Sequence, residues 1–442
     1  LESKISQIQY YKERATEISK NVSPNKGNRT RLEILQGALQ YVENTLYMSL
    51  YGLVFELEKA GHEHGLTHEE VDLRVTKIEK LEQENFGGKI CDNTQEMILC
   101  YESLQEQALF SNKKKAKELE YFLEKIKVLL PKDYRYRKRN PLAQKDLGKV
   151  FQTRIRRDDY VKMFNLVFEI YQLPQQAKIS SVSSIYDGEH FLEIPDSQAY
   201  AHESLKSILQ LMLHEIMAHT VNLENTKRRL GEFRGANNLE KEEGLAVLLE
   251  SLFQGYKLED ISIMSSFPAL LLGEICSTQD FQKYLSLSYK NMFPRFLRFK
   301  RNYPKDLKGV QHKDTSYSRG ILKAQKFLLE GGDMKDLFIG KVNFEDISLL
   351  KNIPLLSEEK PQIAPLMIAE VIHYAVKNGG KLHIHQDAFI KHLAKKYKFR
   401  DIDSLKISYS DPHVKKRICE ILHILSKYIS DIDKDKCDIL FK

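Results

Sequence analysis

The 442-residue sequence contains no tryptophan, and its few cysteines follow no regular pattern. Five is an odd number, and no two of the cysteines form a Cys-x-x-Cys pair. They are Cys91, Cys100, Cys276, Cys419 and Cys437. This distribution argues against a disulfide framework and predicts reduced thiols in an intracellular, cytoplasmic protein.

Long apolar runs are also missing. Apolar stretches such as Phe267 to Leu272 fall far short of the 18 or so residues that a membrane span requires, so no span is expected. The chain has no internal repeat, no low-complexity tract, no Gly-rich phosphate loop and no Gly-x-Ser-x-Gly elbow. The sequence therefore gives no sign of a P-loop nucleotide enzyme or of a serine hydrolase.

The charge balance is mildly basic, with 68 Lys and Arg against 61 Asp and Glu and a formal net charge of +7. Such an excess favours an acidic partner only weakly. The run Tyr134 to Arg139 interleaves aromatic and cationic residues, as some nucleic-acid surfaces do, but a solvated linker is the commoner meaning of such a run. We therefore do not expect nucleic acid as a partner.

Helical periodicity dominates the chain, whose length allows two or three domains. Thr67 and Glu70 form the capping-box pattern of a helix start. Two strands are expected at Lys178 to Val182 and His190 to Ile194, joined by a Tyr-Asp-Gly turn, and the second strand could pair with an extended substrate. We predict a mainly α fold with a small β-sheet (α+β), in which helices are added at both ends of a central core. The expected parts are an N-terminal helical region with a basic linker (1–150), a central domain (151–358) and a C-terminal helical accessory region (359–442).

Two short segments together carry the residues of a catalytic zinc site, namely His214-Glu215-Ile216-Met217-Ala218-His219 and Glu242-Glu243-Gly244-Leu245-Ala246. Neutral His nitrogen and carboxylate oxygen suit Zn²⁺, and three protein ligands leave a fourth position for water. A Glu beside the first His could accept a proton from that water. By chance, a His-Glu-x-x-x-His string arises in about 3 of 100 chains of this composition. The competing interpretation is a pair of core histidines satisfied by hydrogen bonds, next to an acidic helix N-terminus.

The spacing of the two histidines is unusual for a zinc helix. Five residues place them about 140° apart on an ideal α-helix, whereas the familiar spacing of four leaves about 40°. Both side chains could reach one metal only if the helix contains a π-bulge or loosens near Met217-Ala218, where an extra residue is absorbed. The dipeptidyl peptidase III family is similar in having such an insertion.

The combination of His214-Glu215-Ile216 and His219 with Glu243-Gly244-Leu245-Ala246 resembles the tyrosine/phenylalanine carboxypeptidase family. That family includes the microtubule-associated tyrosine carboxypeptidases and bacterial proteins with a Gln-Glu-Gly-Leu-Ala motif. Asp314 to Gly320 is similar to its Asp-x-x-Tyr-x-Arg-Gly segment, and Gly340-Lys341-Val342 fits its place near the end of the family domain. The resemblance covers Asp158 to Leu356, and this chain has Glu242 where the bacterial proteins have Gln.

The resemblance implies that His214, His219 and Glu243 are the ligands of one Zn²⁺ and that Glu215 is the catalytic glutamate. We expect Tyr317 to donate a hydrogen bond to the developing oxyanion. Glu242, next to the ligand Glu243, is expected to orient a ligand histidine from outside the ligand set.

A carboxypeptidase must also recognise a free C-terminal carboxylate, and the planar fork of a guanidinium does this best. Arg319 is the leading candidate because it lies in the matching segment and is followed by Gly320, which permits close approach. The competing interpretation is an Arg that pairs with a local acid such as Asp314 to fix the loop.

The resemblance implies a zincin-like metallopeptidase core, with residues 151–358 as the zinc peptidase domain. The implied activity is that of a zinc metallocarboxypeptidase that removes a C-terminal Tyr or Phe from a protein or peptide. Tubulin would be a substrate only if the source is a eukaryote or acts on a eukaryotic host. One alternative is an aminopeptidase or dipeptidyl peptidase with the same zinc chemistry, which needs an acidic subsite for the substrate amine. The other alternative is a non-catalytic regulatory protein that retains the motif.

Overall fold

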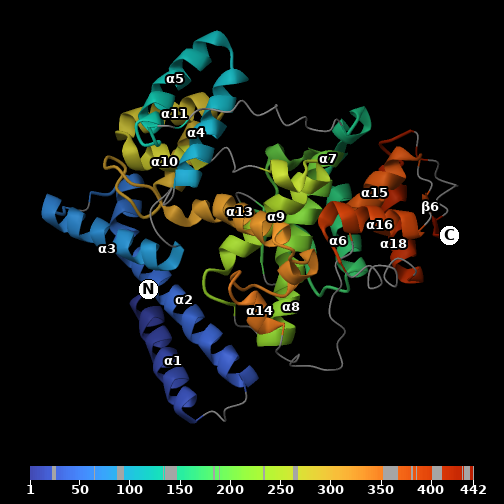
Figure 1. The fold of residues 1–442 in the computed structure, drawn as a ribbon, viewed down its shortest axis with the longest axis horizontal. Helices are drawn as coiled ribbons and strands as arrows, with labels where there is room; N and C mark the ends of the chain where they lie inside the picture. Colours follow the sequence, from blue (N-terminus) through green and yellow to red (C-terminus); the bar gives the residue numbers. More distant parts are fainter. Residues whose placement is uncertain are drawn as a thin grey trace.

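The computed structural model shows a mainly helical protein (Figure 1), and its described residues form three small sheets. This confirms the expected mainly α fold with a small β component. The structure describes residues 1–21, 26–63, 65–86, 94–132, 134, 147–182, 185–188, 190–231, 234–261, 267–351, 367–379, 382–384, 386–400, 411–430, 432 and 439–441.

The N-terminal part of the chain is built from helices. They are α1 (Glu2–Asn21), α2 (Lys26–Lys59), α3 (His68–Phe86), α4 (Thr94–Leu109) and α5 (Lys113–Lys127). The capping box at the start of α3 is confirmed, because Thr67 N donates to Glu70 Oε2 at 2.9 Å and Glu70 N donates to Thr67 Oγ1 at 3.3 Å. Such reciprocal bonds satisfy backbone donors that a helix start leaves open.

Short strands precede the histidine segment. The elements here are η1 (Lys149–Gln152), β1 (Arg154–Arg156), α6 (Arg157–Ile170), β2 (Gln176–Ser180), β3 (Tyr186–Asp187), β4 (Phe191–Pro195), η2 (Gln198–Tyr200) and β5 (His202–Ser204). β1 pairs antiparallel with β5, and a three-stranded sheet has the order β2-β4-β3, with β2 and β4 parallel. The Tyr-Asp pair expected in a turn forms β3 instead. The idea that the second strand offers a free edge to substrate is wrong, because β4 is the middle strand of its sheet.

The rest of the chain is again helical. It comprises α7 (Leu205–Leu211), η3 (Met212–Thr220), α8 (Val221–Leu230), α9 (Asn238–Phe253), η4 (Leu258–Asp260), α10 (Phe267–Ile275), α11 (Thr278–Ser288), α12 (Met292–Phe299), η5 (His312–Asp314), α13 (Thr315–Leu329), η6 (Met334–Phe338), α14 (Ile347–Leu350), α15 (Ile368–Lys377), β6 (Leu382–Ile384), α16 (Gln386–Tyr397), α18 (Pro412–Leu425) and β7 (Ile439–Phe441). β6 and β7 pair in parallel.

The hydrophobic cores cross the expected domain limits. The largest core joins residues of α6 to α9 and α13 with residues of the C-terminal helices α15, α16 and α18. A second core joins α4 and α5 with α10, α11 and α12. Of these helices, α4, α5, α10 and α11 lie together in the upper left of Figure 1. Both terminal regions therefore share apolar cores with the central region, residues 151–358. The boundaries near residues 150 and 358 stay predictions.

Helices α9 and α13 cross at the centre of the molecule with two glycines at the contact (Figure 1). A Cβ added to Gly320 would lie 1.9 Å from Glu240 O and 2.8 Å from Gly244 Cα, and a Cβ on Gly244 would lie 2.1 Å from the Gly320 carbonyl carbon. These neighbours are backbone atoms of the facing helix, so no side-chain movement could make room. The two glycines thus set how closely the helices approach.

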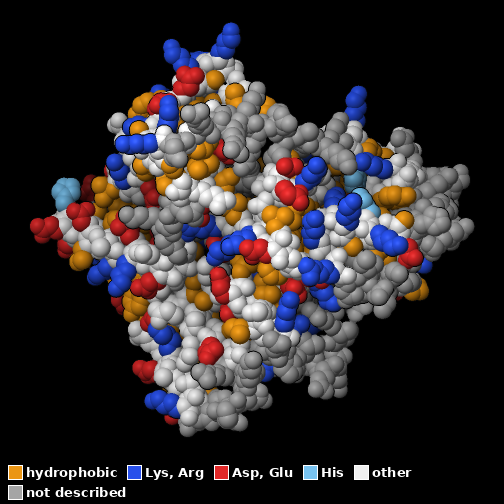
Figure 2. Space-filling model, viewed as in Figure 1, with side chains coloured by type: hydrophobic (Ala, Val, Ile, Leu, Met, Phe, Trp, Pro, Cys, Tyr) orange, Lys and Arg blue, Asp and Glu red, His pale blue; other side chains and the backbone are white. Residues whose placement is uncertain are grey.

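The structure covers only part of the basic run and some of the cysteines on which the expectations about partners and redox state depend. Among the described helices, none has the length and apolar character that crossing a bilayer would need. On the face drawn in Figure 2, Lys and Arg side chains are spread among Asp and Glu side chains. The stretch Arg135–Arg139 of the basic run lies outside the described residues, as do Cys91 and Cys437. Cys276 is a buried free thiol.

We predict that Gly320→Ala lowers the free energy of unfolding by about 1–3 kcal/mol, the usual cost of overpacking a core, because α9 and α13 must separate. Gly37→Ala on α2 is the matched control, since its Cβ would meet Ala236 Cβ at 3.4 Å, an ordinary contact. That control should be neutral or stabilising by up to roughly 1 kcal/mol, the helix-propensity gain of Ala over Gly. Urea denaturation of both variants measures the effect, and a Gly320→Ala protein as stable as the parent would contradict the role of the crossing.

Candidate metal centre

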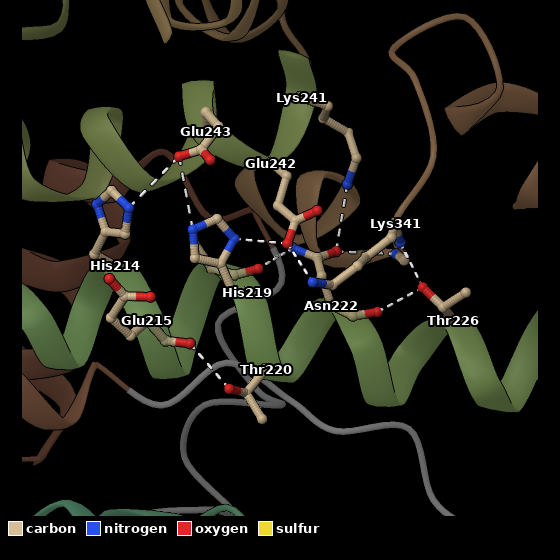
Figure 3. Close-up of polar contacts among 12 residues, drawn as sticks. His214, Glu215, His219, Thr220, Asn222, Thr226, Lys241, Glu242, Glu243 and Lys341 are labelled. Atoms are coloured by element: carbon tan, nitrogen blue, oxygen red, sulfur yellow. Dashed lines mark hydrogen bonds and ion pairs between the residues drawn. The ribbon is translucent and has the colours of Figure 1, made fainter. Parts of the chain in front are cut away.

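The histidine segment is a π-helix, η3, inserted between α7 and α8. A π-helix has i→i+5 hydrogen bonds, so residues five apart become neighbours on one side. The rings of His214 and His219 lie with centroids 5.0 Å apart and planes at 65° (Figure 3). The structure therefore confirms the expected π-type insertion and brings both imidazoles to one place.

Polar side chains bind carbonyl groups of the widened segment. Thr220 Oγ1 donates to Glu215 O at 2.9 Å, and Asn222 Nδ2 donates to Ala218 O at 2.8 Å. Backbone carbonyls that leave the regular i→i+4 pattern need other donors when they are buried. Thr220 and Asn222 supply such donors at the end of the π-helix, and both residues are themselves fully buried.

Glu243, near the start of α9, faces both histidines. Its Oε2 lies 3.5 Å from His214 Nε2 and 3.7 Å from His219 Nε2. The residue is only 7% exposed, and this oxygen has no hydrogen-bond partner among the described residues. A buried carboxylate oxygen without a donor is costly, whereas a cation between it and the two nitrogens would satisfy all three atoms. Two imidazoles and a carboxylate are a donor set that fits Zn²⁺.

The far nitrogen of each ring is held by another carboxylate. His214 Nδ1 lies 2.5 Å from Glu250 Oε1, and His219 Nδ1 lies 2.6 Å from Glu242 Oε1. An Nδ1–H that donates to a carboxylate leaves Nε2 with the lone pair that a metal requires, and fixes the ring orientation. Both Nε2 atoms point toward Glu243 (Figure 3). The expectation that Glu242 orients a histidine agrees with this contact.

Glu242 is part of a buried charge network. It is 4% exposed and forms an ion pair with Lys341, which is 3% exposed and follows η6. Burial alone would raise the pKa of Glu242, but Lys341 and His219 outweigh it and hold that pKa far below its usual value. Burial lowers the pKa of neighbouring Lys241 to about 7, and its Nζ donates to Leu337 O at 2.7 Å. Glu242 therefore stays ionised beside His219.

The carboxylates also act on the imidazoles. Burial lowers the pKa of His214, but the nearby carboxylates of Glu243 and Glu250 outweigh burial and raise it well above 6.5. The pKa of His219 is also raised, since Glu242 and Glu243 outweigh its burial. A metal ion binds the neutral imidazole, so it must displace these protons, and its affinity falls as the pH is lowered.

Glu215 and Tyr317 both lie at this centre. Ligand atoms of His214, Glu215 and His219 lie within 4.8 Å of one another, and the Glu215 carboxylate approaches the rings from the opposite side to Glu243 (Figure 3). Burial raises the pKa of Tyr317 far above its ordinary value, and the neighbouring Glu243 carboxylate raises it further. The phenol thus stays protonated, as a hydrogen-bond donor must.

Arg319 is placed elsewhere. Its side chain is buried, Nη1 donates to Phe86 O at 3.1 Å, and Nε lies 3.5 Å from Glu96 Oε1. These contacts tie α13 to the end of α3 and the start of α4. Asp314, considered as a local partner of Arg319, forms a two-bond pair with Arg298 instead, with N···O distances of 2.8 and 2.9 Å. The structure does not bring Arg319 to the two histidines.

Sequence reasoning missed two members of this centre. Glu250 lies seven residues after Glu243, two turns along the same face of α9, so helical spacing contained a signal for it. The role of Lys341 had no such signal, because its partner Glu242 lies on a distant helix and only tertiary packing joins them.

We predict that the purified protein holds one Zn²⁺ per chain and that His214→Ala or His219→Ala loses it, because two ligands cannot retain the metal at chelator concentrations that three resist. Glu250→Gln should retain zinc with affinity reduced about tenfold or more, since it weakens the partner of His214 Nδ1. Chelator competition followed by metal analysis measures both effects. Glu224→Gln on α8, which removes a carboxylate paired with Lys227, is the matched control. Full zinc retention in both histidine variants would refute the ligand assignment.

Neither a protein-family model nor a curated protein sequence matches this chain. The interpretation of the centre therefore depends on the arrangement of its own side chains. Three donor atoms converge from η3 and α9, and carboxylates orient the two that are imidazole nitrogens. Such a set of residues is fit to hold a zinc ion.

Proposed function

We propose that the protein is a zinc metallocarboxypeptidase with a zincin-like core that removes a C-terminal Tyr or Phe from a protein or peptide. The observation that carries the proposal is the unpartnered Oε2 of Glu243, which faces the Nε2 atoms of two oriented histidines. A pair of satisfied core histidines would not leave a buried carboxylate oxygen without a donor. The substrate class comes from the resemblance to the tyrosine/phenylalanine carboxypeptidase family.

In this proposal the chain's own residues divide the work of peptide hydrolysis. His214, His219 and Glu243 hold the zinc ion, which when bound lowers the pKa of a water and polarises the scissile carbonyl. Glu215 accepts the proton from the attacking water and returns it to the leaving amine. Tyr317, kept protonated beside Glu243, donates a hydrogen bond to the oxygen that becomes negatively charged.

One observation favours a second candidate, an aminopeptidase or dipeptidyl peptidase. A cavity of about 420 Å³ adjoins Glu215 and is lined also by Glu203, Glu250, Tyr200 and Gln210. Glu250 is engaged with His214, but Glu203 has no ion-pair partner among the described residues. An acidic wall next to the catalytic glutamate would suit a substrate amine.

We predict that Glu215→Gln keeps zinc but lowers the rate of hydrolysis about 100-fold or more, because the amide retains the shape of the site and cannot accept a proton. The assay follows release of Tyr or Phe from peptides with aromatic C-termini by mass spectrometry. Glu224→Gln again serves as the control and should keep full activity. A Glu215→Gln protein with near-normal turnover would remove this residue from the mechanism.

One experiment distinguishes the carboxypeptidase from the aminopeptidase or dipeptidyl peptidase. A peptide library with both termini free is incubated with the zinc-loaded protein, and the products are sequenced by mass spectrometry. We expect loss of single aromatic residues from the C-terminus, and N-acetylation should leave the rate unchanged because the substrate amine is not recognised. Loss of N-terminal residues that N-acetylation abolishes would favour the aminopeptidase. A zinc-loaded protein that cleaves nothing would support the non-catalytic alternative.

A further inference from the structure

Recognition of a C-terminal carboxylate needs a cation beside the metal centre. The contacts of helix α13 show which face of this helix is turned toward that centre. Asp314, Tyr317 and Gly320 follow one another at a spacing of three and therefore lie along one face. Gly320 contacts α9 at Gly244, and Tyr317 lies beside Glu243. This face is the one that α13 turns toward the metal centre.

Arg319 belongs to the other side of the helix. It lies two residues after Tyr317, about 200° further around an α-helix. Its contacts with Phe86 and Glu96 agree with this direction. A side chain that is buried against α3 and α4 is not available to a substrate at the histidines. The guanidinium of Arg319 instead joins the N-terminal helices to α13.

Arg298, near the end of α12, approaches the correct face of α13. Its Nε and Nη2 donate to the two oxygens of Asp314 at 2.8 and 2.9 Å. The same guanidinium interacts with the hydroxyl of Tyr317, which in turn interacts with Glu243. The side chain of Tyr317 therefore connects Arg298 to Glu243, a proposed zinc ligand. Its side chain is 41% exposed, so a solute can reach it.

We propose that Arg298, oriented by Asp314, binds the free C-terminal carboxylate of the substrate beside Tyr317. This inference rests on the proposed carboxypeptidase function and names the residue that makes the enzyme specific for a free acid. A guanidinium has five N–H donors, and Asp314 engages two of them, so donors are left for a second carboxylate. Because Asp314 already holds the Arg298 guanidinium in one orientation, less conformational entropy is lost when the substrate binds.

The charge around Arg298 also suits an anion. Asp314 balances the charge of Arg298, but Arg295 lies one turn earlier on α12 and adds a second cation. Its guanidinium lies over the ring of Tyr289, 5.4 Å from the centroid, and no carboxylate in the described part of the chain forms an ion pair with it. Two arginines and one carboxylate therefore lie close together here, whereas Glu203 and Glu250 line the cavity beside Glu215.

The test measures binding without turnover. Zinc-loaded Glu215→Gln protein is titrated into a fluorescein-labelled hexapeptide that ends in Tyr, prepared as the free acid and as the C-terminal amide. We expect the free acid to bind more tightly, and Arg298→Gln in the same background to reduce this preference about tenfold to hundredfold, the worth of charged hydrogen bonds. Asp314→Asn keeps the cation but releases its orientation, so it should reduce the preference less. Fluorescence anisotropy gives both affinities.

Two arginines serve as controls. Arg301→Gln removes an exposed cation just beyond α12, and Arg319→Gln removes the buried contact with Glu96, so neither should change the preference for the free acid. A preference that persists in Arg298→Gln, or that is lost in Arg319→Gln alone, overturns the inference and leaves the carboxypeptidase function standing. Equal binding of acid and amide by the Glu215→Gln protein itself would overturn the carboxypeptidase function together with the inference.

Discussion

Two histidines five residues apart can face one metal only where the helix that carries them is wider than an α-helix. The π-helical segment η3 meets this constraint, and the other parts of the centre are arranged around it. Its two Nε2 atoms face Glu243, while Glu242 and Glu250 hold the opposite nitrogens. An α-helical η3 would turn one imidazole away, so that Glu243 would face a single ring. The chemistry proposed for the site therefore depends on the π-helical backbone of η3.

The close crossing of α9 and α13 provides the second constraint. Gly244 directly follows the proposed ligand Glu243, and Gly320 lies one turn after Tyr317. Because the two backbones touch there, a phenol on α13 reaches a carboxylate on α9 without a long side chain between them. Lys341 neutralises Glu242 in the buried interior. This ion pair allows the adjacent carboxylates of Glu242 and Glu243 to be buried together near the start of α9. Packing and electrostatics thus hold the same few residues in place.

The surroundings of the centre differ in charge from one side to the other. Glu203 and Glu250 line the cavity beside Glu215, whereas Arg298 and Arg295 lie on the side of Tyr317. A peptide is itself polar from end to end, with an amine at one terminus and a carboxylate at the other. In the proposed enzyme, such a difference in charge would favour one direction of a bound peptide. The difference in charge therefore concerns the proposed specificity, whereas the proposed zinc ligands concern the proposed chemical step.

The sequence by itself determined the helical character of the chain, the capping box at Thr67, and the need for a π-type insertion if His214 and His219 are to face one metal. These features depend on local spacing, which the order of residues records directly. The position of Glu243 beside the two histidines was implied only by the family resemblance, because Glu243 lies on a different helix. Helical spacing also places Tyr317 and Arg319 on different faces of any helix that includes both. Tertiary structure alone decided that β4 is a middle strand, that Lys341 neutralises Glu242, that both terminal regions share cores with the central segment, and that Asp314 holds Arg298. Each of these depends on contacts between residues distant in the chain, whose pairing is set by packing and not by any local pattern.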